Sequence, residues 1–266
     1  MEYLSTFSAA GGQRIRINVG CSGWFYSHWR GIFYPRQEPT TKNWFAYYAN
    51  VFGTVELNAP FYRWPTSATV RRWKRDAPPT FVYSVKVNQR ITHEKRMVRT
   101  KHLVKSYYEI APALGEKMGC FLFQFPPSYR FSASRLRSIV AQLDPAHRNV
   151  VEFRHRSWWR DSVYHAFARH GIGFCAVSAP RLPEVVPPNQ RLLYVRLSGK
   201  TQWYRHDYSP EELRLWIDRI RASGAEETWV YFNNDREGFA IKNALRLRRM
   251  LRTSDEVVRP RTPDAT

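Results

Sequence analysis

The chain has 266 residues and a mass of 31.5 kDa, and its 43% hydrophobic and 24% charged residues allow one large core, so intrinsic disorder is excluded for most of it. No segment approaches the roughly 18 to 20 uncharged apolar residues of a membrane-spanning helix, and residues 1–13 lack the basic start and apolar run of a secretory signal, so we expect a cytoplasmic protein with no membrane partner. The formal net charge of +20 favours an anionic partner.

Short apolar runs, rich in β-branched and aromatic residues, recur along the chain with helical periodicity between most of them. This alternation is typical of βα units around a parallel sheet. Eight runs are present, the number that closes a (β/α)8 barrel, so we predict an α/β fold with a single TIM-type barrel. The predicted strands are Ile15 to Cys21, Thr54 to Asn58, Phe81 to Val87, Cys120 to Phe125, Asn149 to Arg154, Gly173 to Ser178, Leu192 to Leu197 and Thr228 to Asn233.

Seven segments between the strands have helical periodicity, and Ser209 before Pro210 and two glutamates is a strong helix start. Segment 179–190 contains four prolines, so we expect the outer helix after strand six to be missing. The predicted helices are Thr41 to Val51, Ser67 to Asp76, Thr100 to Gly115, Ser132 to Gln142, Arg160 to His170, Ser209 to Ser223 and Gly238 to Arg252.

We place one barrel domain at residues 15–252, between a flexible N-terminal segment, 1–14, and a flexible C-terminal tail, 253–266. A doubly wound open sheet is the main structural alternative. It calls for a glycine-rich phosphate loop after an early strand, and Gly20, Gly23 and Gly31 lack the dinucleotide-binding spacing.

Polar residues at the carboxyl ends of the predicted strands are the candidate site, because barrel active sites form there. Side chains alternate along a strand, so Glu56 shares a face with Asn58, and Glu152 shares one with Arg154. If those faces point inward, the two carboxylates meet in one cavity. The other strand ends add Lys86, Gln124, Arg196 and Asn233.

Three cations, Lys86, Arg154 and Arg196, outnumber the two carboxylates, which predicts an electropositive pocket that an anion completes. The alternative is a purely structural ion network that fills the barrel interior. Charge is also uneven along the chain, since residues 61–120 carry a net charge of +9 and residues 1–60 only +2. A codon bias toward arginine is the alternative explanation of the surplus. We expect an anionic small molecule or nucleic acid as the partner, and the sequence identifies no partner protein.

Loops after the strands add further candidates. His93 lies in a basic loop after strand three, and its ordinary pKa near neutrality suits proton transfer. Aromatic residues, among them Trp24 and Tyr62, could stack sugars or bases, or could simply seal the core. The strand ends lack the ligands of a multinuclear metal centre, so we predict no metal site, and the cofactor remains unknown. The three cysteines, Cys21, Cys120 and Cys175, are predicted to be reduced core thiols.

Five motifs follow one another along the chain: Val19-Gly20-Cys21-Ser22-Gly23-Trp24, Phe52 to Tyr62, Ile91-Thr92-His93-Glu94, Val151-Glu152-Phe153-Arg154-His155 and Tyr231-Phe232-Asn233-Asn234-Asp235. They resemble the YecE-like family, also called domain of unknown function seventy-two, over about residues 15–251. The resemblance implies a TIM-type barrel and no established reaction. In two places the chain departs from the family pattern: Ala59 and Pro60 replace Ser-Thr, and Ser198 replaces a histidine.

These observations favour an enzyme that binds a phosphate-bearing substrate through Lys86, Arg154 and Arg196. Glu56 or Glu152 would be the general base and His93 the acid, in hydrolysis of a phosphoester, for example in nucleic acid. The alternatives are a sugar-phosphate isomerase and a non-catalytic nucleic-acid-binding barrel.

Overall fold

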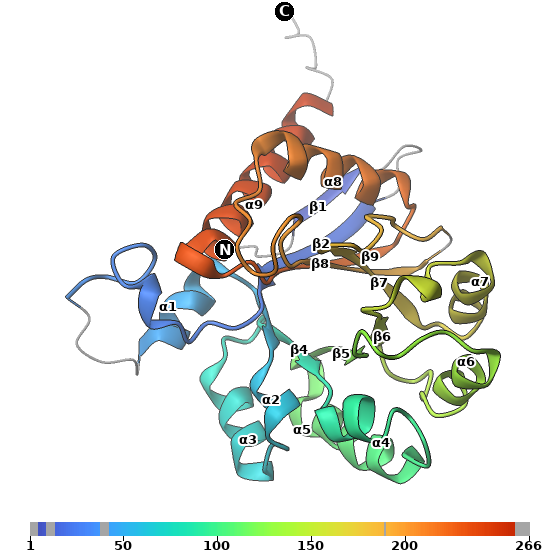
Figure 1. Cartoon of the computed structure of the whole chain (residues 1–266). Helices are drawn as coiled ribbons and strands as arrows, with labels where there is room; N and C mark the ends of the chain where they lie inside the picture. Colours follow the sequence, from blue (N-terminus) through green and yellow to red (C-terminus); the bar gives the residue numbers. More distant parts are fainter. Residues whose placement is uncertain (1–4, 9–13, 38–42, 189, 259–266) are drawn as a thin grey trace, which may run out of the picture.

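A computed structural model describes residues 5–8, 14–37, 43–188 and 190–258. Parallel strands form the inner wall of a barrel and helices surround it, as Figure 1 shows. The strands are β1 (Ser5–Ser8), β2 (Arg14–Cys21), β3 (Thr54–Leu57), β4 (Val82–Lys86), β5 (Met118–Gln124), β6 (Asn149–Glu152), β7 (Gly173–Ser178), β8 (Leu192–Leu197) and β9 (Glu227–Phe232). The predicted TIM-type fold is confirmed.

The α-helices occupy the predicted segments, with boundaries shifted by a few residues. Thr66, Ser132 and Ser209 each accept a hydrogen bond from a backbone N–H of the first turn, and Ser209 forms a capping box with Glu212. The helices are α1 (Trp44–Val51), α2 (Ala59–Tyr62), α3 (Ser67–Asp76), α4 (Lys101–Tyr108), α5 (Ile110–Leu114), α6 (Ala133–Val140), α7 (Asp161–Arg169), α8 (Pro210–Ala222) and α9 (Phe239–Val258).

No helix lies among the described residues between β7 and β8, as predicted from the four prolines. Strand β1, the short helix α2 and a π-helical turn over Arg90–Glu94, η3, were not predicted. Nor were the 3₁₀ turns Ser27–Trp29, Gly115–Lys117, Arg156–Trp158 and Arg236–Gly238. Strand β1 pairs antiparallel with β2 inside the segment that we expected to be flexible, and α9 continues six residues beyond the expected end at Arg252. The remainder of both predicted flexible ends, residues 1–4, 9–13 and 259–266, lies outside the described residues.

Strand order is β1-β2-β9-β8-β7-β6-β5-β4-β3, so the ladder runs almost fully around the barrel. Strands β2 and β3 close the ring without pairing directly. The Tyr48 hydroxyl, from α1, bridges them, because it accepts from the Cys21 N–H at 2.9 Å and donates to the Thr54 carbonyl at 2.9 Å. At this seam a Cβ on Gly20 would lie 2.3 Å from the Thr54 oxygen, so the close approach requires glycine.

The barrel interior is filled in two tiers. An apolar cluster in the interior includes the buried residues Leu122, Val150, Val177 and Trp229. A charged tier occupies the carboxyl ends of the strands, where Glu56, Glu152 and Arg196 are each at most 1% exposed. The larger hydrophobic cluster lies between the sheet and the outer helices. The polar groups of the candidate site therefore stand on a rigid, packed base.

Candidate functional site at the carboxyl end of the barrel

Arg196 links the two predicted carboxylates at the centre of the barrel. Its Nε and Nη2 donate to the two oxygens of Glu56 at 3.0 and 2.7 Å, and its Nη1 donates to Glu152 Oε2 at 2.6 Å. Glu56 lies on β3, Glu152 on β6 and Arg196 on β8. The inward-facing geometry that strand alternation predicted thus brings all three together, and Arg196 has its guanidinium directed at protein carboxylates.

Glu56 has hydrogen-bond donors at every acceptor position that a carboxylate offers. Oε1 accepts from Ser22 Oγ at 2.8 Å and from Arg196, and Oε2 accepts from the Tyr194 hydroxyl at 2.7 Å and from Arg196. Ser22 and Tyr194 were not among the predicted site residues. Tyr194 precedes Arg196 by two on the same strand, so the alternation rule already placed it on the same inward face.

Glu152 is paired on both oxygens, because Arg154 Nε donates to Oε1 and Arg196 to Oε2. Burial acts to raise the pKa of Glu152, but Arg154, Arg196 and Lys86 more than offset it and hold the pKa at about 2. The guanidinium of Arg154 also stacks on Trp203, 4.1 Å from the ring centre. Glu152 is therefore a stable anion and a weak base at neutral pH.

Lys86 is the cation left over when these pairs are counted. It is 8% exposed, and its ammonium lies 3.9 Å from the ring centre of Phe61. Among the described residues no hydrogen bond or ion pair reaches this ammonium, unlike the two arginines. Burial, reinforced by the charge of Arg196, lowers the pKa of Lys86 from 10.5 to about 7. Lys86 is thus the unpaired cation behind the predicted excess of positive charge at the mouth, and its pKa lies near neutrality.

His93 joins the same cluster from the η3 turn. Its ring contacts Phe61 edge-on, with centroids 4.9 Å apart, and Nδ1 lies 2.9 Å from Thr92 Oγ1. Burial and the nearby positive charge of Lys86 lower the pKa of His93 from 6.5 to about 4. The imidazole is neutral at pH 7, so this environment does not favour the role of proton donor that the sequence suggested.

The other predicted residues lie around this cluster with different partners. Asn58 donates to the Ser22 carbonyl at 3.2 Å, buried Gln124 donates to the Phe125 carbonyl at 3.1 Å, and Asn233 lies 3.4 Å from Ser198 Oγ. Trp24 packs on Phe45, with centroids 5.0 Å apart, and Tyr62 is 71% exposed. Asn58 therefore joins the charged tier through Ser22, whereas Trp24 contributes to packing.

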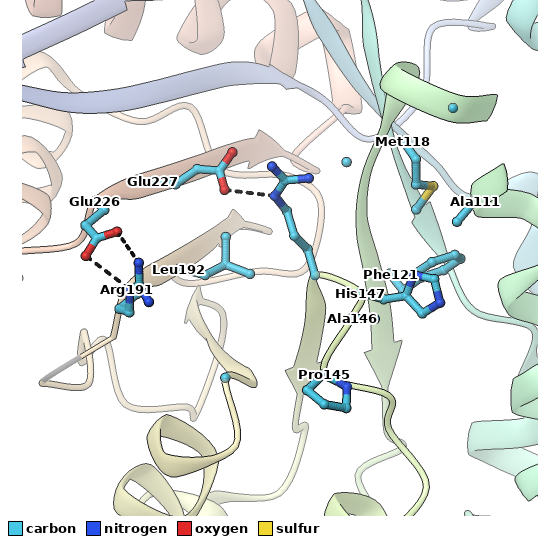
Figure 2. A pocket seen from close by; sticks show the side chains of 14 residues that line it. Ala111, Met118, Phe121, Pro145, Ala146, His147, Arg191, Leu192, Glu226 and Glu227 are labelled. Carbon is cyan, nitrogen blue, oxygen red and sulfur yellow. Dashed lines mark hydrogen bonds and ion pairs between the residues drawn. The ribbon is translucent and has the colours of Figure 1, made fainter.

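A pocket of about 580 Å³ opens at the opposite end of the barrel, where the strands start, and Figure 2 shows it. Its two arginines are already neutralised, since Arg191 pairs with Glu226 and Arg148 with Glu227, both at 2.9 Å. In TIM-type barrels the active site forms at the carboxyl ends of the strands, and the opposite end contributes to stability. Of the two cations that are buried among the described residues, Lys86 and Arg196, only Lys86 has no ion pair with a carboxylate.

Two further observations concern metal binding and membranes. In the described part of the chain, no group of three or more His, Cys, Asp or Glu side chains is arranged to hold a metal ion. Over the same residues, no helix is both long and apolar enough to cross a membrane. The three cysteines are buried and free, as predicted for core thiols, and burial raises the pKa of each.

Comparison with known proteins agrees with the motifs. The chain is 25% identical to the UPF0759 protein YunF of Bacillus subtilis (strain 168), over 93% of this chain and 99% of that protein. A DUF72 family protein (TM1631) of Thermotoga maritima MSB8 superposes with a TM-score of 0.78 at 29% identity, over 89% of this chain and 99% of that one. One of Enterococcus faecalis V583 (EF0366) shares the fold, with a TM-score of 0.73 at 19% identity over 89% and 95%.

The family profile described as "Protein of unknown function DUF72" matches residues 18–266. That range includes the charged tier, Lys86 and the loops after β2 to β9. The resemblance inferred from the five motifs is confirmed, and the chain belongs to the DUF72 family.

Proposed function

We propose that the protein is an enzyme that binds a phosphate-bearing substrate at the barrel mouth, with Lys86 as the group that carries the proton. The observation behind this proposal is the isolation of Lys86: a nearly buried ammonium beside two carboxylates that Arg154 and Arg196 already neutralise. An incoming anion would gain an ion pair with Lys86 and would stabilise its protonated form.

Phosphoester hydrolysis is the reaction that this arrangement suits. Water would attack phosphorus as the bond to the leaving oxygen breaks, and the ammonium of Lys86 would donate its proton to that oxygen. The proton that the attacking water releases would restore the ammonium, and a pKa near 7 is close to optimal for such an acid. Arg154 is the second cation that faces the mouth, held by Glu152 and Trp203. Glu56 and Glu152 act in this proposal as fixed anions that orient the arginines, which differs from the base role we first gave them.

The first test measures the lysine titration directly. The chain has nine lysines, so their side-chain NMR signals are few, and Lys86→Met identifies the one of interest. We expect one lysine to titrate near pH 7 and its pKa to rise by about one unit when sulfate, whose charge is constant over this range, is added. Because the neutral amine of Lys86 attracts an anion less than its ammonium does, sulfate affinity should fall as the pH rises above the pKa of Lys86.

Turnover is tested with bis(p-nitrophenyl) phosphate. Lys86→Arg keeps a positive charge but cannot release a proton near neutrality, so we expect it to retain sulfate binding and lose activity by about 100-fold or more. Lys105→Met, on the exposed face of α4, is the matched control. Sulfate binding without turnover in the natural protein would exclude the enzyme and leave an anion-binding barrel. Nine lysines that all titrate near pH 10 would exclude the proposal altogether.

A further inference from the structure

Positive charge is concentrated at one end of one half of the barrel. The loops that follow β3, β4, β5 and β6, residues 58–66, 87–100, 125–132 and 153–160, carry nine Lys or Arg residues and one acidic residue, Glu94. Eight of the nine cations are exposed, and the ninth is Arg154. We call these four loops the basic arc. Together they surround Lys86 and His93, which lie on β4 and in the second loop.

The connecting segments at the opposite end of the same half carry no net charge. The connections that lead into β4, β5, β6 and β7, residues 77–81, 115–117, 141–148 and 170–172, carry two cations, Lys117 and Arg148, and two acids, Glu116 and Asp144. A genome-wide preference for arginine would add cations to the connections at both ends alike. The polarity of the barrel therefore indicates a polyanion at the mouth, where charge complementarity steers and holds it.

The longest loop of the arc is held in an unusual backbone conformation. Arg96, Met97 and Arg99 have positive φ values of 51°, 59° and 52°, which are costly for residues other than glycine. Gln142 fixes them, because its Nε2 donates to the Met97 carbonyl at 2.7 Å and its Oε1 accepts from Thr100 N–H and Oγ1 at 3.1 and 2.8 Å. Hydrogen bonds from Gln142 thus hold the backbone that carries the cations of this loop.

An aromatic platform stands beside these cations. Tyr62 is 71% exposed, follows Phe61 in the first loop of the arc and contacts that ring edge-on at 5.0 Å. Phe61 in turn lies under the ammonium of Lys86. Arg63, adjacent to Tyr62, is exposed as well. Exposed aromatic rings interleaved with cations are the arrangement that binds unpaired bases and a phosphate backbone at the same time.

We infer that the basic arc binds single-stranded nucleic acid, with its phosphates on the exposed arginines and an unpaired base on Tyr62. This inference rests on the proposed function in that it names the substrate class of the same mouth. A single strand fits better than a duplex, because Lys86 is recessed at 8% exposure and Tyr62 can stack only on a base that is not already paired.

The test compares two triple variants with the same change in charge. Arg63→Gln, Arg90→Gln and Arg156→Gln remove three exposed cations from the arc. Lys105→Gln, Arg137→Gln and Arg169→Gln remove three exposed cations from the last turns of α4, α6 and α7, at the other end of the barrel. Binding of a fluorescent oligothymidylate of about 20 nucleotides is measured by anisotropy between about 50 and 200 mM salt.

We expect the arc variant to bind about 10- to 100-fold more weakly, with a salt slope smaller by about 2, and the control variant to bind like the natural chain. Tyr62→Ala should weaken single-strand binding by about 5-fold or more, and a duplex of the same sequence should bind less tightly than the single strand. Equal losses in both triple variants, or tighter binding of the duplex, would overturn the inference.

The outcome separates this inference from the proposed function. Sulfate binding at Lys86 without oligothymidylate affinity would retain an anionic small-molecule substrate and exclude the strand. Oligothymidylate binding that depends on the arc, in a protein whose Lys86 titrates near pH 10, would retain the strand-binding surface and exclude the catalytic role of Lys86.

Discussion

At the scale of single residues, the site is decided by which cation has an anionic partner. The sequence placed Glu56, Glu152, Lys86, Arg154 and Arg196 at one end of the barrel, because alternation along each strand needs only local pattern. Their pairing could not be predicted. It depends on how a residue of β8 reaches across the interior to one of β3, 140 positions away in the chain.

Glu56 provides the residue-scale prediction. In Glu56→Gln, Arg196 loses the carboxylate that it contacts through two nitrogens, and two of the four hydrogen-bond donors around position 56 face an amide N–H₂ instead of an oxygen. Because the group is fully buried, we expect the free energy of unfolding to fall by about 3 to 5 kcal/mol. Urea unfolding followed by circular dichroism measures it.

The matched control for that measurement is Glu109→Gln, at an exposed position, which should change stability by about 0.5 kcal/mol or less. If Glu56→Gln were no less stable than this control, the hydrogen bonds and ion pair of Glu56 with Arg196 would add nothing to stability. The account of the charged tier given above would then be wrong.

At the scale of elements, the hydrophobic pattern together with the prolines and helix-capping residues predicted most of the fold. All eight apolar runs are strands, because buried parallel strands need continuous apolar residues. The predicted helix Thr100 to Gly115 instead divides into α4 and α5 around Glu109. The π-helical turn η3 and the short strand β1 were missed, since a charged stretch and four polar or aromatic residues have no distinguishing period.

Gln142 tests whether the longest loop of the basic arc is held as the structure shows. Gln142→Ala removes one of the two side-chain donors to the Met97 carbonyl, the other being Ser138 Oγ at 2.8 Å, and it removes the acceptor for Thr100. The three residues with positive φ therefore lose part of their support. We expect a loss of about 1 to 3 kcal/mol in the free energy of unfolding and faster hydrogen exchange at amides 96–100.

The exposed residue Gln202, in the loop after β8, supplies the comparison: Gln202→Ala should leave exchange in residues 96–100 unchanged. Slow exchange of those amides in Gln142→Ala would mean that the left-handed conformation does not depend on this side chain. Other contacts would then hold these residues at positive φ.

At the scale of the whole molecule, the barrel is closed by a side chain. The ladder runs without a break from β2 through β9 to β3, as can be followed in Figure 1, and the two ends of that ladder meet at a seam with no direct strand pairing. Thr54 and Cys21 flank the seam, and Glu56 and Ser22, the next inward-facing positions, are joined there by a hydrogen bond of 2.8 Å. The two strands at the seam therefore position Ser22 and Glu56 on one side of the candidate site.

The hydroxyl of Tyr48, which bridges β2 and β3, allows the closure of the barrel to be tested. Burial raises the pKa of Tyr48 well above its usual value, so its hydroxyl keeps the proton that it donates to Thr54 while it accepts from Cys21. Tyr48→Phe leaves a buried N–H and a buried carbonyl without this partner, and we expect a loss of about 2 to 4 kcal/mol in urea unfolding. Tyr47→Phe, at a neighbouring 40% exposed ring, is the control. The Cys21 amide should exchange faster in Tyr48→Phe, because its hydrogen-bond acceptor is removed. If the amide stays protected, β2 and β3 pair directly in solution and the ring closes through the backbone alone.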